Sequence, residues 1–216
     1  MIKGENLSKK YGDLAVLKSV SIQIQTSEIV SITGPSGAGK STLLQLLGTL
    51  DTPTEGTVFY DDVDLKTLKA NKMAKFRNEN IGFIFQFHHL LPEFTAIENI
   101  SMPAFIAGQS KSQAGVRAAE LLKMLGLADR MEHKPNELSG GEQQRVAVAR
   151  ALMNNPKVIF ADEPSGNLDT ENAEELHHLF LRLREELNQT FVIVTHNADL
   201  AKMADRKIEM KDGRII

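Results

Sequence analysis

A glycine-rich octapeptide has the residue types and spacing needed to bind a nucleoside triphosphate. Residues 34–41 read Gly-Pro-Ser-Gly-Ala-Gly-Lys-Ser and fit the phosphate-binding pattern G-x-x-x-x-G-K-[ST]. The glycines allow a tight turn that points backbone N–H groups at phosphate oxygens, next to the positive end of a helix. Lys40 adds a cation for the β- and γ-phosphates, and the Ser41 hydroxyl is suited to complete the coordination of Mg²⁺. The octapeptide alone leaves one alternative open, a glycine-rich turn without a ligand.

Four side chains at the ends of strand-like runs could supply the remaining chemistry. Asp162 follows the apolar run Val158–Ala161 and is expected to hold Mg²⁺ through water. The adjacent Glu163 would be free of the metal and suited to act as general base for the attacking water. We assign Gln86 to the metal and water, and His196 to the γ-phosphate. The alternatives are a loop glutamine and a surface or core histidine.

A second anion site is predicted where a later helix begins. Residues 138–142 read Leu-Ser-Gly-Gly-Glu and open a helix that runs to about Met153. The serine and glycine N–H groups would then lie at the positive end of that helix. Earlier in the chain, Tyr11 precedes the octapeptide and could stack on an adenine ring, although simple packing is the alternative.

The pattern of apolar residues predicts an α/β fold that brings these groups to one edge of a sheet, where ligands of parallel sheets bind. The expected strands are 2–7, 15–24, 28–33, 54–60, 81–85, 158–161 and 191–195, and residues 206–216 form a closing hairpin. The expected helices are 41–50, 66–79, 95–107, 112–125, 138–153 and 170–188. From Phe87 to about Asn155 only helices are expected, which suggests a helical lobe inserted in the α/β core.

Length and composition bound the class of protein. The chain has 216 residues, 42% of them hydrophobic and 25% charged, as in soluble globular proteins with one large domain or two small lobes. A net charge of -3 gives no support for a nucleic-acid-binding surface. The absence of cysteine excludes disulfides and thiolate chemistry, and the lack of a signal peptide points to the cytoplasm. No apolar run reaches the length needed to cross a bilayer.

The order of these motifs resembles that of the ATP-binding-cassette ATPases over nearly the whole chain. The resemblance implies a P-loop NTPase fold with a mainly parallel core sheet, an antiparallel β subdomain and an inserted helical lobe. It implies one domain over 1–216, with the α/β core at about 1–86 and 156–216 and the helical subdomain at about 87–155. Glu142 departs from the family's usual glutamine.

In this family, Tyr11 would be the adenine-stacking aromatic, Gln86 the Q-loop residue, Asp169 the D-loop residue and His196 the switch histidine. The resemblance implies ATP and Mg²⁺ as ligands. Catalytic roles would fall to Glu163, His196, Gln86 and Lys40, and metal ligation to Ser41, Gln86 and Asp162. Nucleotide contacts would come from Tyr11, Gly34, Pro35, Ser36, Gly37, Ala38, Gly39, Lys40, Ser41, Thr42, Ser139, Gly140, Gly141, Glu142 and Asp169.

The resemblance also implies partners. Cassette ATPases act as ATP-dependent, head-to-tail dimers, in which Ser139 would complete the partner's site and Asp169 would pass information across the interface. Residues 86–103 resemble the lipoprotein-releasing members, and 162–169 a broader group that includes efflux and cell-division ATPases. This implies a peripheral subunit on the cytoplasmic face of the inner membrane.

Integral membrane permease subunits would then dock near Phe87–Pro103, although these apolar residues could equally form the core of the helical lobe. The alternatives for function are an efflux or cell-division ATPase and, more remotely, a soluble cassette ATPase of DNA repair or translation. The remote alternative lacks support, because the chain has no long coiled-coil insertion and no second cassette. No nucleic-acid partner is expected.

Overall fold

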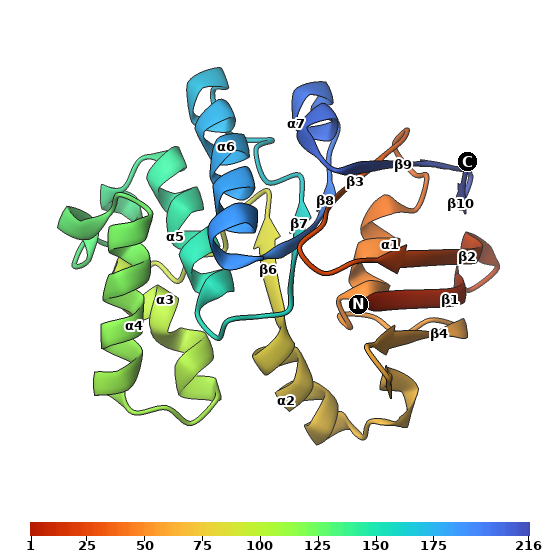
Figure 1. Cartoon of the computed structure of the whole chain (residues 1–216), viewed down its shortest axis with the longest axis horizontal. Helices are drawn as coiled ribbons and strands as arrows, with labels where there is room; N and C mark the ends of the chain where they lie inside the picture. The colour runs from red at the N-terminus through yellow and green to blue at the C-terminus, as the bar shows by residue number, and fades with distance from the viewer. The chain divides into compact units, whose positions relative to one another are not determined.

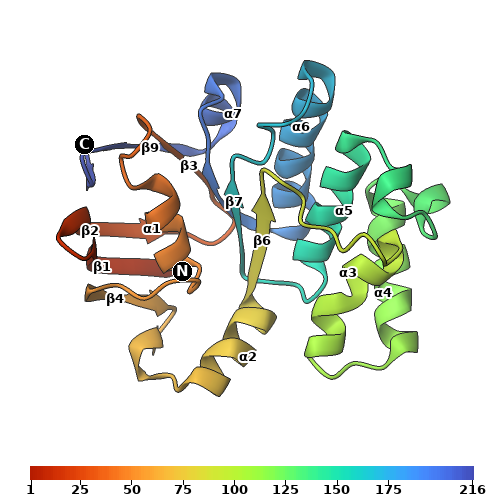
Figure 2. The same ribbon diagram turned by 180° about the vertical axis from the view of Figure 1, so that it is seen from behind.

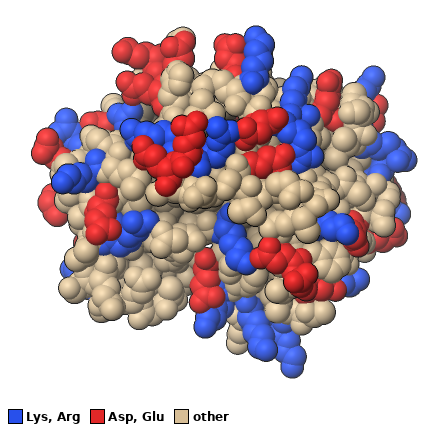
Figure 3. All heavy atoms as spheres, in the orientation of Figure 1, with Lys and Arg blue, Asp and Glu red and all other residues tan.

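The computed structural model describes all residues, 1–216, and the chain forms two compact units (Figure 1). The first unit comprises Met1–Ala74 and Leu181–Ile216, and the second comprises Lys75–Phe180. Two helices, α2 (Ala70–Asn80) and α6 (Thr170–Leu187), each pass from one unit into the other. None of the helices combines the length and apolarity needed to cross a lipid bilayer. Charged side chains of both signs occur on the face shown in Figure 3.

The first unit contains an antiparallel sheet with the strand order β2-β1-β4-β5. Its strands are β1 (Ile2–Tyr11), β2 (Leu14–Ile24), β4 (Glu55–Tyr60) and β5 (Val63–Asp64). Residues 9–11 belong to β1, whereas the sequence prediction placed them between strands. Tyr11 pairs with Leu14, so that only two residues are left to form the hairpin turn. Gly12 has φ +58° there, as such tight turns require.

The same unit contains four neighbouring strands of a second sheet, in the order β10-β9-β3-β8, and the glycine-rich loop follows β3 (Figure 1). These strands are β3 (Ile29–Thr33), β8 (Thr190–Val194), β9 (Arg206–Lys211) and β10 (Arg214–Ile215). β3 is parallel to both β8 and β9. β8 is buried throughout, as its continuous β-branched and aromatic sequence predicts. Helices α1 (Lys40–Leu47) and α7 (Ala198–Met203) follow β3 and β8.

A carboxylate fixes the start of β3. Asp205 accepts a hydrogen bond from the Ile29 N–H at 2.8 Å, and its other oxygen pairs with Arg184. Burial alone would raise the pKa of Asp205, but the Ile29 N–H and the Arg184 guanidinium lower it below its ordinary value. The charged carboxylate therefore ties the first residue of β3 to the segment between α7 and β9.

The second unit joins two parallel strands to a group of helices that lie side by side in Figures 1 and 2. Strand β6 (Ile81–Phe85) pairs with β7 (Val158–Asp162), and Phe85 lies opposite Asp162. The helices are α3 (Ala96–Ile106), α4 (Lys111–Met124) and α5 (Gly140–Leu152), with 3₁₀ turns at Ala128–Arg130 and Pro135–Glu137. Between β6 and β7 the chain forms helices and no strand.

The predicted α/β class, with parallel and antiparallel strands, is confirmed, and the predicted capping box of Thr95 and Glu98 starts α3. Two helical predictions were wrong in detail, and one helix was not predicted. The helix expected from residue 66 begins at Ala70, because Asp64 accepts the Lys66 N–H and starts a 3₁₀ turn, Leu65–Thr67. α1 ends at Leu47 because Gly48 caps it. The six-residue α7, capped by Asn197, was not predicted.

Candidate functional site

The glycine-rich loop takes backbone conformations that need glycine. Gly34, Gly37 and Gly39 have φ of +140°, +77° and +94°. A Cβ atom on Gly34 would lie 2.1 Å from the Met210 carbonyl oxygen, and one on Gly39 would lie 2.8 Å from Leu17 Cδ2. The loop therefore begins pressed against the backbone of β9, and no side chain fits at Gly34. This close packing fixes the start of the cradle that the phosphate-binding pattern predicts.

Lys40 is the cation of this loop. Lys40 is only 6% exposed, and its Nζ donates hydrogen bonds to the Gly34 and Pro35 carbonyl oxygens at 2.9 and 3.0 Å. A buried ammonium is costly unless it is hydrogen-bonded, and these two carbonyls compensate it. The ammonium thus lies inside the loop, where it can bind phosphate oxygens. Ser41 and Thr42 follow in the half-buried first turn of α1.

Tyr11 lies at the end of β1 and is 49% exposed. Its hydroxyl donates to Asp51 Oδ2 at 2.7 Å, and Lys9 Nζ donates to Asp51 Oδ1 at 2.6 Å. The bond to Asp51 raises the pKa of Tyr11. Burial would raise the pKa of Asp51, but its bonds with Lys9 and Tyr11 lower it. Lys9 Nζ also lies 4.9 Å from the centre of the Tyr11 ring, so these contacts fix the ring of an exposed aromatic residue.

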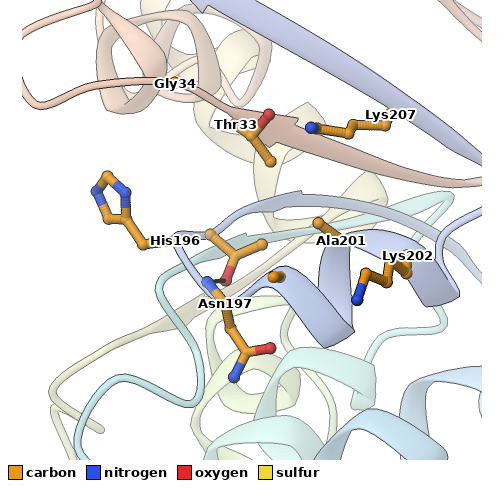
Figure 4. A pocket seen from close by; sticks show the side chains of 9 residues that line it. Thr33, Gly34, His196, Asn197, Ala201, Lys202 and Lys207 are labelled. Carbon is orange, nitrogen blue, oxygen red and sulfur yellow. Dashed lines mark hydrogen bonds between the residues drawn. The ribbon is translucent and has the colours of Figure 1, made fainter.

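His196 lies two residues after the end of β8 and is exposed. A cavity of about 250 Å³ lies beside it, with Gly34 at the end of β3 and Lys207 on β9 among its lining residues. In Figure 4 the Lys207 ammonium points toward Thr33, and the imidazole extends away from both Lys207 and Lys202. The first unit therefore holds the glycine-rich loop, Lys40, Tyr11 and His196.

In the second unit, the parallel pairing of β6 and β7 brings their carboxyl ends together. Phe85 lies opposite Asp162, so Gln86 and Glu163 follow at the same edge. Glu163 has φ +48°, which is uncommon for a residue with a side chain, and its carbonyl oxygen accepts the Gly166 N–H at 3.0 Å. This turn places two acidic groups in succession, with Asp162 still in the strand and Glu163 in a different backbone conformation.

Gln86 forms a reciprocal pair with Asn167, a residue that sequence reasoning missed. Gln86 Nε2 donates to Asn167 Oδ1 at 2.9 Å, and Asn167 Nδ2 donates to the Gln86 carbonyl oxygen at 3.1 Å. Because the pair uses the amide nitrogen of Gln86, the amide oxygen is the atom left for a metal ligand. The only signal in the sequence was the position of Asn167 within the acidic motif at 162–169.

Ser139 and Glu142 form a capping box at the start of α5. Ser139 Oγ accepts the Glu142 N–H at 3.2 Å, and the Ser139 N–H donates to Glu142 Oε2 at 2.8 Å. Arg130 Nε donates to Glu142 Oε1 at 2.9 Å. The hydrogen bond from the Ser139 N–H lowers the pKa of Glu142. Burial acts in the opposite direction, but the bond from Arg130 lowers the pKa further. The carboxylate that replaces the family's glutamine therefore caps its own helix and pairs with Arg130.

Asp169 and Gly141 meet at Asn172. Asp169 accepts hydrogen bonds from the backbone N–H of Asn172 at 2.9 Å and from its side-chain N–H at 2.8 Å. These bonds lower the pKa of Asp169, and the backbone bond has the larger effect. A Cβ on Gly141 would lie 2.0 Å from Asn172 Oδ1. Gly141 thus lets the start of α5 pack against the residue that Asp169 holds. Gln86, Ser139, Glu163 and Asp169 all belong to this second unit.

The comparison with protein families decides the class. The family model described as ABC transporter matches residues 17–166. The chain belongs to the ABC transporter family. Its motifs are those of the ATP-binding subunit, and this ABC subunit hydrolyses ATP.

Relatives match the ABC subunit over its full length. "Lipoprotein-releasing system ATP-binding protein LolD" of Bacteroides thetaiotaomicron is 61% identical over 100% of this chain and 99% of the relative. The LolD of Idiomarina loihiensis is 48% identical over 99% of this chain and 95% of the relative.

Solved structures confirm the P-loop NTPase fold of the ABC subunit. A dimeric post-hydrolysis state of the ATP-binding cassette MJ0796, bound to ADP and Pi, has a TM-score of 0.89 and 43% identity, and covers 100% of this chain and 96% of that chain. The cbiO1 protein of Clostridium perfringens, part of the transporter complex cbiONQ, has a TM-score of 0.90 and 30% identity, and covers 100% and 86%.

The two exchanges Gly34→Ala and Gly37→Ala test how the loop is built. Gly34→Ala should abolish ATP binding and lower the melting temperature, because its Cβ would meet the Met210 carbonyl oxygen. At Gly37 no atom lies within 4 Å of an added Cβ, so Gly37→Ala should cost only the strain of positive φ, about 1–2 kcal/mol. Binding of a fluorescent ATP analogue and thermal melting measure both effects. Equal behaviour of the two variants would contradict this packing.

Proposed function

We propose that the chain powers the release of lipoproteins from the inner membrane, as the ATP-hydrolysing subunit of a complex with integral membrane subunits. The observation that carries this proposal is the full-length similarity to proteins named as lipoprotein-releasing system ATP-binding proteins, at 61%, 58% and 56% identity. The chain would act as a peripheral subunit on the cytoplasmic face of that membrane.

For phosphate binding, we propose the loop from Gly34 to Ser41 together with Thr42. The positive-φ glycines and the buried Lys40 ammonium fit an anionic group bearing several phosphates. Tyr11 would present its ring to the adenine. His196 would donate a hydrogen bond to the γ-phosphate. Ser36, Ala38 and Gly39 would complete the cradle through their backbone N–H groups, and Pro35, which has no N–H, would shape the turn through its carbonyl oxygen.

For metal binding, we propose Ser41, Gln86 and Asp162. They offer a hydroxyl, an amide oxygen and a carboxylate, which are the hard oxygen ligands that Mg²⁺ prefers. The chain has no group of three or more His, Cys, Asp and Glu side chains suited to a metal, so ATP itself would supply further oxygens. When bound, Mg²⁺ offsets negative charge on the phosphates. Asn167 would hold the amide of Gln86 with its oxygen free.

Glu163 is the proposed general base. It follows Asp162 and has a different backbone conformation, so one carboxylate can serve the metal while the other accepts a proton from water. Gln86, at the same edge of the β6–β7 pair, would orient that water through its amide. Lys40 would stabilise the charge that develops on the phosphate oxygens.

The proposed active form is an ATP-dependent homodimer, which the dimeric structures of MJ0796 support. Ser139, Gly140, Gly141 and Glu142 would complete the nucleotide site of the partner subunit, since the start of α5 offers N–H groups and a hydroxyl. Asp169 would contact the partner near the same site. Its bonds to Asn172, beside Gly141, support a link between these two elements.

The proposed docking surface for the membrane subunits is the segment from Phe87 to Pro103. Phe87, Leu91 and Phe94 are 65%, 43% and 37% exposed, which favours a surface role over a place in the helical core. Two polar side chains hold the segment. The buried Asn99 bonds to the Leu91 backbone and the Phe94 carbonyl, and Arg150 donates to the His88 and His89 carbonyls at 2.7 Å each.

Glu163→Gln should reduce ATP turnover by about 100-fold or more while leaving ATP binding intact, because the amide cannot accept the proton of the attacking water. Phosphate release and equilibrium binding of ATP measure the two quantities separately. Near-normal hydrolysis in this variant would remove Glu163 from the role of base.

Ser139→Arg should prevent dimerisation in the presence of ATP, because a long cationic side chain would fill the space that the partner's nucleotide needs. ATP should still bind to the phosphate loop of the monomer. Analytical ultracentrifugation with ATP measures the dimer, and Glu163→Gln serves as the dimer-forming control. A dimer of normal affinity would contradict the shared site.

Co-purification tests the proposed cargo. The tagged chain, isolated in mild detergent from native membranes, should bring down integral membrane subunits with bound lipoproteins, identified by mass spectrometry. Phe87→Asp should lose these subunits and keep ATP binding. Recovery with an efflux permease or a division protein would refute lipoprotein release and keep the ATPase, whereas ribosomes or DNA-repair proteins would refute transport altogether.

A further inference from the structure

The turn after β7 holds the proposed base in a conformation that needs support. Glu163 has φ +48°, and the left-handed region is unfavourable for a residue with a side chain. Such strain persists only where surrounding contacts determine the backbone. The turn's own bond, from the Gly166 N–H to the Glu163 carbonyl oxygen, supplies one of these contacts. The others must come from neighbouring elements.

A buried amide on α5 supplies the next contact. Gln144 is 1% exposed, and its Nε2 donates to the Pro164 carbonyl oxygen at 2.6 Å and to the Phe85 carbonyl oxygen at 3.4 Å. Pro164 directly follows Glu163, and Phe85 directly precedes Gln86. One side chain therefore holds the end of β6 and the turn after β7, each within one residue of a proposed catalytic group.

The choice of glutamine at this position has a physical reason. Gln144 lies on the buried face of α5, three residues after Gly141 and four before Val148, where an apolar residue would be expected. Its Oε1 is buried without a hydrogen-bond partner, a desolvation cost that an apolar side chain would avoid. Among uncharged side chains, only those of Asn and Gln carry two N–H donors on one nitrogen. The two carbonyls thus account for a glutamine here.

An independent contact holds the next residue from α6. His177, 3% exposed, has its Nε2 3.1 Å from Ser165 Oγ, and Ser165 is itself buried. Pro164 and Ser165 are thus fixed by side chains of two different helices. The backbone that carries Glu163 has little freedom to relax toward an ordinary conformation.

We propose that Gln144 is a positioning residue for ATP hydrolysis, which holds Glu163 and Gln86 in the relative positions that the reaction requires. This inference rests on the proposed roles of Glu163 and Gln86. Because Gln144 and Ser139 belong to the same helix, a displacement of the start of α5 would also move the carbonyls next to both catalytic groups. Gln144 would therefore link the site that Ser139 completes in the partner to the base of its own subunit.

Gln144→Met tests this role, with Gln143→Met as the matched control. Gln143 lies next to it on α5 and also donates two bonds from its Nε2, to the Pro135 and Leu138 carbonyls at 2.9 and 3.1 Å, away from Glu163. We expect Gln144→Met to lower kcat by about 10- to 100-fold, with KM for ATP and ATP affinity changed less than about twofold. Gln143→Met should keep kcat within about threefold.

Gln144→Glu gives a readout that a purely structural role would not move. The introduced carboxylate has the same length but no donor, so kcat should fall as in Gln144→Met. Protonation restores one O–H donor, and burial raises the pKa of a carboxyl, so kcat relative to the natural chain should rise as the pH falls toward about 6. A constant ratio across pH would count against the donor role.

Three results would overturn the inference: normal kcat in folded Gln144→Met, equal losses in both methionine variants, or a loss that comes from ATP affinity. Melting temperatures identify folded variants, and Gln144→Asn, which keeps the amide but is too short, replaces Gln144→Met if that variant fails to fold. Glu163→Gln in the same assay separates the hypotheses. Retained turnover there refutes the base, whereas normal turnover in the Gln144 variants refutes the positioning role alone.

Discussion

The buried ammonium of Lys40 imposes the constraint on which the proposed nucleotide-binding part of the first unit depends. A charge with so little access to water must be hydrogen-bonded, and the Gly34 and Pro35 carbonyls provide those bonds. They can do so only because the loop turns through positive-φ glycines, the first of which touches the backbone at Met210. The proposed phosphate cradle, formed early in the chain, is therefore shaped by β9, a strand close to the C-terminus. At the other end of β9, Asp205 directly precedes the strand and accepts a hydrogen bond from the Ile29 N–H, which fixes that end.

In the second unit the corresponding constraint is the need to satisfy loop carbonyls. Segments that carry proposed catalytic or docking groups lack the hydrogen bonds of helices and sheets, and buried polar groups that lack partners are costly. Long amide and guanidinium side chains meet this need: Gln144 bonds to Pro164, and Arg150 bonds to His88 and His89. The reciprocal amide pair of Gln86 and Asn167 does the same at the surface. The loops are thus held by polar contacts from neighbouring helices.

The features that the sequence predicted are those that depend on local chemistry. The glycine spacing at 34–39, the buried run at 191–194 and the capping box of Thr95 and Glu98 each follow from a few adjacent residues. The family membership added roles for these motifs. The contacts of Asn167 and Gln144, in contrast, join residues 81 and 20 positions apart, so no local pattern reveals them. The extension of β1 to Tyr11 likewise depends on cross-strand pairing, and the short α7 leaves too few residues for a periodic signal.

Helix α5 shows how these constraints combine into a mechanism. Its 13 residues span about 20 Å, and three side chains that hold proposed functional segments lie at its start and along its length. Ser139 caps its start, Gln144 holds the backbone beside Glu163, and Arg150 near its end holds the proposed docking segment. Close-packed protein interiors have low compressibility and transmit strain, and one face of α5 is buried. A force that a membrane partner applied at the proposed docking segment would therefore reach the start of α5 and the proposed base without a separate relay.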